Sequence, residues 1–220
     1  MKRPLTVMLG LAAASVQAAP PGMVALRAPQ LEMSVAWDDR KGWEAAPPAA
    51  LGGVDGAAAQ QTDVRARWNE SGIFFEFICR DSALVAPGRE DGLDHFRLGD
   101  VVEIFLARSG AASYAEVHAT PAGRKSLYFF RGERRPGPVS AAAERIAVRA
   151  DEIRGGWRAV IFVPWAVLGA DGPVEVCDFL AGRYDYAIAG GAPVLSSFPG
   201  QSGRADFHER GRYARLVLRP

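Results

Sequence analysis

Residues 62–80 have the sequence TDVRARWNESGIFFEFICR. Two runs rich in β-branched and aromatic residues are separated by residues 69–72, Asn-Glu-Ser-Gly, a composition typical of a tight turn. The segment therefore predicts an antiparallel β-hairpin. In its second strand, Phe74 and Ile78 are apolar on the face opposite Phe77, which indicates burial on both faces and a central position in a sheet.

The same pattern extends along the chain. Short apolar runs bounded by Gly, Pro, Asp and Asn recur, while helical periodicity is nearly absent. Strands of this length with turns at short intervals predict an all-β fold, an antiparallel β-sandwich of the immunoglobulin-like or DOMON-like kind, in a single domain covering residues 19–220. The expected strands are Val64–Trp68, Ile73–Arg80, Val101–Ala107, Tyr114–Thr120, Lys125–Phe130, Arg145–Arg149, Trp157–Val163, Arg183–Ala189 and Tyr213–Leu218.

One carboxylate stands among apolar neighbours in the strand expected at residues 101–107. Because side chains alternate along a strand, Glu103 shares its face with Val101 and Phe105. An unpaired charge there is costly, so a partner or a ligand is expected. The Gly-rich, charged loop at residues 86–99 leads directly into this strand, and loops on a rigid scaffold commonly carry binding groups.

The first residues have the features of a secretory signal. Lys2 and Arg3 precede an apolar run over residues 5–16 that is too short for a membrane anchor. Small residues then precede two prolines. We expect a signal peptide at residues 1–18, cleavage after Ala18, and a periplasmic or extracellular protein.

Composition excludes several partners and leaves the state of the cysteines open. The chain has 26 basic and 25 acidic residues and no basic stripe, which argues against nucleic acid, and no later segment resembles a membrane span. Cys79 and Cys177 are the only cysteines. In an oxidising compartment they either form a disulfide or pack as buried thiols. With two thiols and no paired histidines, we expect no metal site and no cofactor.

Catalytic motifs are also missing. Asp100 and Glu103 suggest a glycosidase pair, but residues three apart in a strand point to opposite faces, so the two can converge only if Asp100 lies in the preceding loop. The sequence has no Gly-x-Ser-x-Gly elbow and no phosphate-binding glycine loop. We therefore expect that the protein is not an enzyme.

Several motifs in fixed order resemble a carbohydrate-binding family 9-like module, a group related to the DOMON sandwiches. The most specific is residues 100–105, DVVEIF, which resembles the family's Asp-x-Val-Glu-x-Phe motif. The other matching segments span nearly all of the chain after the signal and comprise Trp43 with Ala45, Thr62–Arg65, Ile73–Asp81, Tyr114 with Glu116, Pro121 with Gly123, Gly156–Trp157, Pro164–Trp165, Leu168–Gly169, Phe207–His208, and Leu216 with Leu218.

The resemblance implies a non-catalytic protein that stacks a carbohydrate between aromatic rings and hydrogen-bonds its hydroxyls. Glu103 falls on the carboxylate that relatives turn toward sugar hydroxyls, and His118 falls near a charged hydrogen-bonding residue of a relative. The two clamp tryptophans of relatives fall near Phe96 or Arg97 and near Phe207. These five residues form the expected binding site. Relatives can carry calcium, but no loop here has the run of Asp and Asn that would place it.

Two alternatives stay open. A haem-binding DOMON-type electron-transfer domain needs axial His and Met ligands, for which the chain after the signal offers Met23, Met33, His95, His118 and His208. A secreted interaction module without a ligand is the other alternative, because phenylalanine replaces the clamp tryptophans. The sequence predicts neither the sugar nor the oligomeric state.

Overall fold

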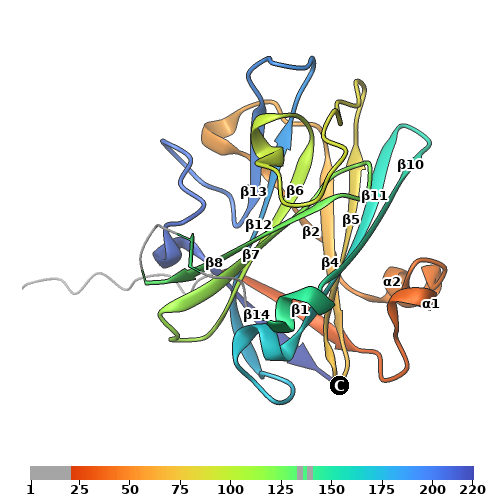
Figure 1. Ribbon diagram of the computed structural model, residues 1–220, viewed down its shortest axis with the longest axis vertical. Coiled ribbons are helices and arrows are strands. Elements are labelled where there is room, and N and C mark those ends of the chain that lie inside the picture. Colours follow the sequence, from red (N-terminus) through yellow and green to blue (C-terminus); the bar gives the residue numbers. More distant parts are fainter. Residues whose placement is uncertain (1–20, 133–135, 138–140) are drawn as a thin grey trace, which may run out of the picture.

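The computed structural model describes residues 21–132, 136–137 and 141–220 (Figure 1). The predicted signal peptide, residues 1–18, lies outside the described residues. Within the described part of the chain, no helix is long and apolar enough to cross a membrane.

Strands dominate the described residues, and the two α-helices are short. The helices are α1 (Met33–Ala36) and α2 (Arg40–Ala45). The strands are β1 (Gly22–Arg27), β2 (Ala49–Ala50), β3 (Gly52–Gly53), β4 (Thr62–Trp68), β5 (Gly72–Arg80), β6 (Val101–Arg108), β7 (Ser113–Ala119), β8 (Lys125–Arg131), β9 (Pro136–Gly137), β10 (Ala147–Ile153), β11 (Gly156–Pro164), β12 (Val176–Asp185), β13 (Val194–Phe198) and β14 (Ala214–Arg219).

The strands form one curled, mixed sheet. Its main path runs β10-β11-β5-β4-β1-β14-β12-β6-β7-β8-β9 (Figure 1). The all-β prediction is confirmed, but the purely antiparallel arrangement is wrong, because β1 lies parallel to both of its neighbours, β14 and β4. These two strands run in the same direction, so a strand that fills the gap between them can pair in parallel with both. The buried side chains of Met23 and Ala25 anchor β1 there.

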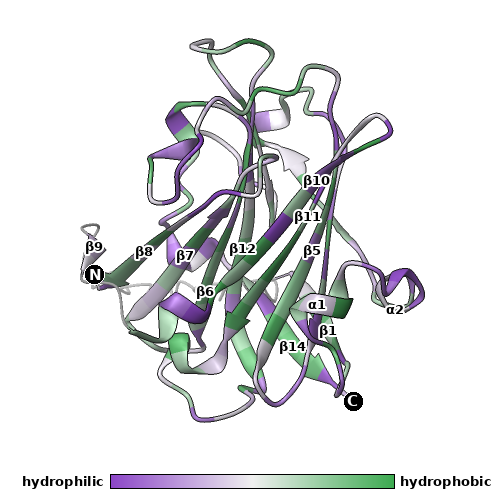
Figure 2. Ribbon diagram, turned by 45° about the vertical axis from the view of Figure 1, so that its right-hand side comes forward, coloured by the Kyte–Doolittle hydropathy of each residue, from purple (hydrophilic) through white to green (hydrophobic). Residues whose placement is uncertain are grey.

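Curling brings distant parts of the sheet together around one large core. Phe75 on β5 stacks on Phe179 of β12 with ring centroids 5.3 Å apart, although three strands separate β5 from β12 in the sheet. Trp157 and Trp165 are fully buried in the same core. Figure 2 shows apolar stretches along the strands that enclose it.

The predicted hairpin is confirmed. β4 and β5 pair antiparallel, and the side-chain oxygen of Asn69 accepts hydrogen bonds from the backbone N–H groups of Ser71 and Gly72 at 2.9 and 3.1 Å. β5 lies between β4 and β11 and is buried on both faces, as its sequence predicts. On the outer face, Trp43 of α2 packs with Phe74.

Two strands differ from the sequence prediction by more than two residues at one end or at both. The strand expected at residues 183–189 instead covers Val176–Asp185, because Asp178 and Gly182 interrupt its apolar pattern and hide its start. The strand expected at residues 145–149 covers Ala147–Ile153. β1, β13 and the two-residue strands β2, β3 and β9 were not predicted.

Both cysteines are free, buried thiols. Of the two arrangements that the sequence left open, the structure therefore has the one in which Cys79 and Cys177 pack as small apolar side chains. Burial raises the pKa of each thiol to about 12, so both stay protonated and unreactive at neutral pH.

Candidate functional site

A pocket of about 370 Å³ opens on the sheet face that points away from the large core, over β12, β6, β7 and β8. Its lining is mainly aromatic, with a few charged groups. The lining residues are Asp94, Phe96, Arg97, Glu103, Phe105, Glu116, Tyr128, Phe130, Pro136, Tyr184, Ala205, Phe207 and His208.

Strand alternation and register place the charged groups on this face. Glu103 on β6 pairs directly with His118 on β7, and Phe105 pairs with Glu116. The intervening residue Ile104 points to the opposite face and joins the large core. One face of β6 and β7 thus forms the polar floor of the pocket, and the opposite face packs in the large core.

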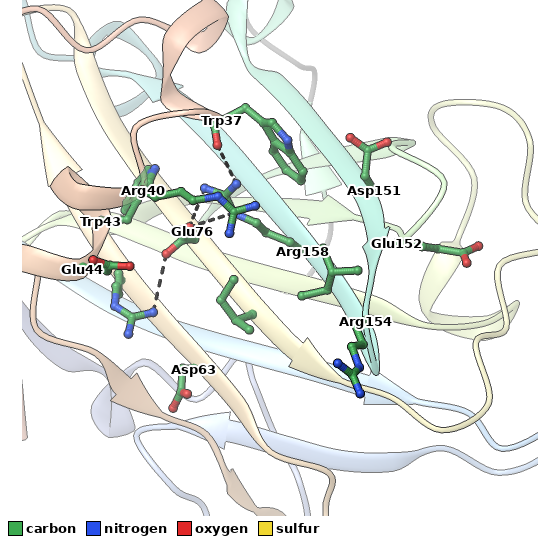
Figure 3. A pocket seen from close by; sticks show the side chains of 13 residues that line it. Trp37, Arg40, Trp43, Glu44, Asp63, Glu76, Asp151, Glu152, Arg154 and Arg158 are labelled. Carbon is green, nitrogen blue, oxygen red and sulfur yellow. Dashed lines mark hydrogen bonds and ion pairs between the residues drawn. The ribbon is translucent and has the colours of Figure 1, made fainter.

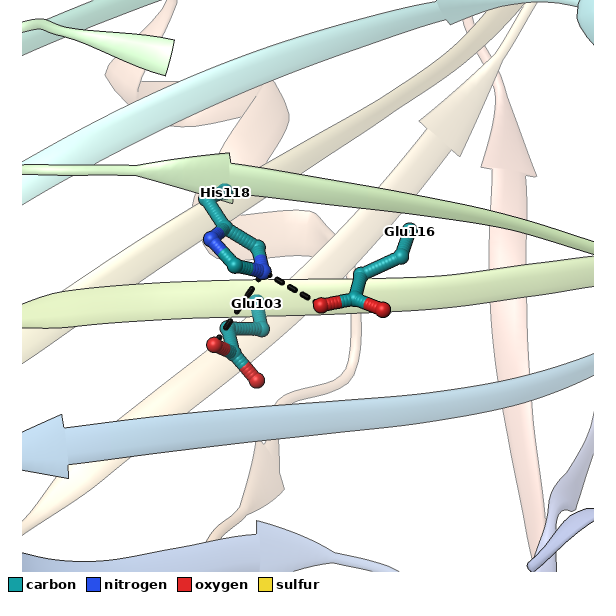
Figure 4. Close-up of side chains that lie close together, drawn as sticks. All are labelled: Glu103, Glu116 and His118. Carbon is teal, nitrogen blue, oxygen red and sulfur yellow. Dashed lines mark hydrogen bonds and ion pairs between the residues drawn. The ribbon is translucent and has the colours of Figure 1, made fainter. Parts of the chain in front are cut away.

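The floor of the pocket holds a buried acid–imidazole–acid group, which we call the Glu-His-Glu cluster: Glu103, Glu116 and His118. The His118 Nε2 atom lies 3.2 Å from Glu103 Oε1 and 2.6 Å from Glu116 Oε1 (Figure 4). The exposed fractions of the side chains are 2% for Glu103, 7% for Glu116 and 0% for His118.

Burial and the charges of the neighbouring side chains act on the pKa values of Glu103 and His118 in opposite directions. Burial raises the pKa of Glu103; the positive charge of His118 opposes the rise and the negative charge of Glu116 adds to it. For His118, burial alone would lower the pKa, but the charge of Glu103 and the hydrogen bond to Glu116 outweigh it and raise the pKa. The imidazole and the two carboxylates therefore depend on one another for charge compensation.

Two phenylalanines lining the pocket are each fixed through the backbone by a tyrosine hydroxyl. Tyr186 donates to the carbonyl oxygen of Phe96 at 2.7 Å, and Tyr213 donates to that of Phe207 at 2.9 Å. The ring of Phe207 also meets Tyr184 edge-on, with centroids 5.9 Å apart. The apolar walls are therefore held in place rather than left as free loop side chains.

Asp100 ties the loop that carries Phe96 to the sheet. Its Oδ1 accepts the backbone N–H of Tyr186 at 2.7 Å, and its Oδ2 accepts that of Val85 at 2.6 Å. The carboxylate thus joins both ends of the loop to the segment that follows β12. Asp100 precedes β6, the position from which it could converge with Glu103, but both of its oxygens accept backbone hydrogen bonds.

The five residues expected at the site gather around this pocket. Phe96, Glu103 and Phe207 line it; His118 lies under the floor, where it contacts Glu103. Arg97 is at the rim with 70% of its side chain exposed, and its guanidinium lies over the Phe96 ring, 5.2 Å from the centroid. Carbohydrate contact by these residues stays a prediction.

Sequence analysis missed three prominent residues of the pocket. Glu116 stands two residues before His118, so the period of two places both side chains on one face. Tyr128 follows the same rule on β8, where it pairs with Glu116. Tyr184 lies within the strand expected at residues 183–189, but its place beside the pocket follows from the pairing of β12 with β6, which the sequence did not predict. The alternation of side chains along β7 and β8 could have identified Glu116 and Tyr128 from the sequence.

A second hollow, of about 820 Å³, lies over β4, β5 and β11 beside α2 (Figure 3). At its floor, Glu76 accepts a hydrogen bond from Arg158 Nε at 2.8 Å and lies 3.5 Å from Arg65. Arg158 also lies 4.3 Å from the centroid of the Trp37 ring. Glu76 is thus paired with both guanidinium groups, and the Arg158 guanidinium covers the Trp37 ring. The smaller pocket, whose lining is mainly aromatic, is therefore the better ligand site.

The histidines and methionines considered as haem ligands lie in different places. His118 and His208 belong to the pocket region, whereas Met23 is part of the large core on β1 and Met33 packs with the helices α1 and α2. No observation in the described residues brings a methionine to the pocket.

Comparisons with known proteins find solved structures of similar architecture. No protein-family model and no curated protein matches the chain. Among solved structures, a Bacteroides uniformis protein provisionally described as carbohydrate-binding superposes with a TM-score of 0.77 at 14% identity, over 91% of this chain and 100% of that one.

A carbohydrate-binding module of family 9 from Caldicellulosiruptor kristjanssonii also superposes, in two complexes. The complex with cellotriose has a TM-score of 0.62 at 12% identity, over 90% of this chain and 93% of that one. The complex with glucose has a TM-score of 0.63 at 11% identity, over 90% and 95%. The chain has a family 9-like fold. The resemblance carried by the sequence motifs is thereby confirmed at the level of fold.

Proposed function

We propose that the protein binds a carbohydrate in the pocket over β12, β6, β7 and β8. The observation that carries the proposal is the combination, in one pocket, of aromatic walls with two carboxylates at the floor. A pyranose has apolar C–H faces and a polar rim, so it fits a site of this composition. Support comes from the family 9-like fold, since one structural neighbour is seen with glucose and cellotriose.

In this proposal Glu103 and Glu116 accept hydrogen bonds from sugar hydroxyls, and Phe96 and Phe207 supply the apolar contact surface. His118 is fully buried, so it acts as a positioning residue that holds both carboxylates. Arg97 donates to the ligand from the rim. Phenylalanine offers a smaller stacking surface than tryptophan, which favours a short ligand over a long chain.

We also propose that the protein does not hydrolyse its ligand. In glycosidases, two carboxyl groups flank the scissile bond and lie about 5 Å or more apart. Glu103 and Glu116 instead contact the same imidazole nitrogen, and oxygen atoms of the two lie within 4.8 Å of each other on one floor. Both approach a ligand from the same side, which suits binding better than acid–base attack.

Titration calorimetry with glucose, cellotriose and a wider glycan panel tests the proposal. Glu103→Gln keeps the shape of the side chain but removes its charge, and Phe207→Ala removes a wall. Each should weaken binding by about 1–2 kcal/mol. Glu152→Gln, in the second hollow, is the matched control and should bind normally.

Two results would contradict this function. One is the absence of binding to every glycan of the panel; the other is unchanged affinity in both pocket variants. Release of reducing sugar that disappears in Glu103→Gln would show catalysis instead.

A further inference from the structure

In the Glu-His-Glu cluster, two buried carboxylates face a single imidazole. Within residues 21–132, 136–137 and 141–220, no lysine or arginine forms an ion pair with Glu103 or Glu116. If both carboxyl groups are ionised, they leave one net negative charge beside a charged imidazole, which either a retained proton or a bound cation can balance. Uncompensated buried charge is expensive.

A second observation concerns hydrogen bonding. Glu116 Oε2 is buried and has no hydrogen-bond partner among the described residues. His208 Nδ1 lies 3.9 Å from this oxygen, which is beyond hydrogen-bond distance. His208 also lines the pocket. The Glu116 side chain is 93% buried and has an unpaired oxygen at the floor of the pocket. Buried polar atoms are normally hydrogen-bonded, so a ligand is expected at this oxygen.

A nearby group shows what a satisfied cluster looks like in the same protein. Asp81, Asp100 and Asp185 also bring their oxygens within 4.8 Å of one another. There, however, every carboxylate oxygen accepts a hydrogen bond, from Arg183, from the Gln60 side chain or from a backbone N–H group. In the Glu-His-Glu cluster, Glu116 Oε2 has no such donor among the described residues.

We propose that the Glu-His-Glu cluster binds a divalent transition metal ion of the Zn²⁺ class. One oxygen each from Glu103 and Glu116 and the Nε2 atom of His118 are the ligands. These atoms lie within 4.8 Å of one another, and imidazole nitrogen and carboxylate oxygen are both zinc ligands. Bonds of about 2.1 Å to a tetrahedral ion place neighbouring ligand atoms about 3.4 Å apart, so small side-chain rotations complete the site.

Such an ion would neutralise both carboxylates and replace the proton on Nε2. Three protein ligands leave a fourth position, and because Glu103 and Glu116 line the pocket, that position is open to water or to a ligand oxygen. His118 Nδ1 has no hydrogen-bond partner among the described residues, so the imidazole lacks the outer acceptor that strengthens many zinc sites. We therefore expect micromolar rather than tighter binding.

The test uses the whole protein without sugar, so its result does not depend on the proposed carbohydrate function. After treatment with a chelator and dialysis, titration with Zn²⁺ should show one bound ion per chain. Glu103→Gln and Glu116→Gln preserve side-chain size and should each weaken binding at least tenfold. Glu152→Gln, which removes a carboxylate of the second hollow, is the control and should bind as the parent does.

A second measurement needs no variant. Cobalt(II) bound by one nitrogen and two carboxylates with fewer than six ligands absorbs visible light more strongly than hydrated cobalt, and Zn²⁺ should displace it. Zinc binding unaffected by both glutamine variants, a cobalt spectrum that stays that of the hydrated ion, or a preference for Ca²⁺ over Zn²⁺ would each overturn the proposal. A sugar titration in chelator measures the carbohydrate proposal separately.

Discussion

Gly182 is the residue against which the Phe207 ring rests. A Cβ atom at position 182 would lie 2.8 Å from Phe207 Cε2 and 3.0 Å from Cδ2. Gly182 is also the cross-strand partner of Glu103 in the β12–β6 pairing. The missing side chain thus lets an aromatic wall approach the strand next to the pocket floor, which explains a glycine in the middle of a central strand.

Gly182→Ala should therefore displace the Phe207 ring while leaving the sheet intact. We expect affinity for a verified sugar to fall about tenfold, equivalent to about 1.4 kcal/mol. Calorimetry measures the affinity, and circular dichroism checks the fold. Gly52→Ala, at a position where a Cβ meets nothing within 4 Å, is the control. Equal affinity in both variants would show that Phe207 does not contact the ligand.

Asp100→Asn should destabilise the protein by about 1–3 kcal/mol. The amide oxygen can accept only one of the two backbone N–H groups, from Val85 or Tyr186, and the amide nitrogen then faces the other donor. Urea unfolding measures the change in the free energy of unfolding. The exposed Asp171→Asn should change it by less than about 0.5 kcal/mol. A loss no larger than that of the control would mean that the loop closes without this carboxylate.

Neither cysteine should react with a thiol reagent in the folded protein. Cys79 and Cys177 are both 0% exposed, and burial raises the pKa of each thiol to about 12. A colorimetric thiol count should give none in native buffer and two per chain in denaturant. Absence of thiols in denaturant would indicate a disulfide, and two reactive thiols in native buffer would contradict the burial.

Export is tested by the mass of the mature protein. We expect the exported chain to begin at Ala19, because small residues precede that position and two prolines follow it. Intact-mass spectrometry of material from the exporting cell measures this directly. Recovery of the chain with Met1 in the cytosol would contradict the proposal.

Local sequence patterns were sufficient for β5 and β6, because alternation and flanking turns are properties of neighbouring residues. The parallel pairing of β1 could not be predicted, because it depends on β14, at the other end of the described chain. Two of the three residues of the Glu-His-Glu cluster, Glu103 and His118, were predicted as site residues. Alternation places Glu116 on the same face as His118, but only the β6–β7 register shows that this face meets Glu103. Cross-strand partners are set by the whole sheet, and no local pattern contains that information.

The alternation on β6 has a consequence for how this protein can change. Glu103 and Phe105 face the pocket, whereas Ile104 and Leu106 face the core. Ligand preference and thermodynamic stability are therefore encoded at interleaved positions of one strand. Evolution or a designer can exchange the odd-numbered side chains for a new specificity while the even-numbered ones keep the scaffold folded.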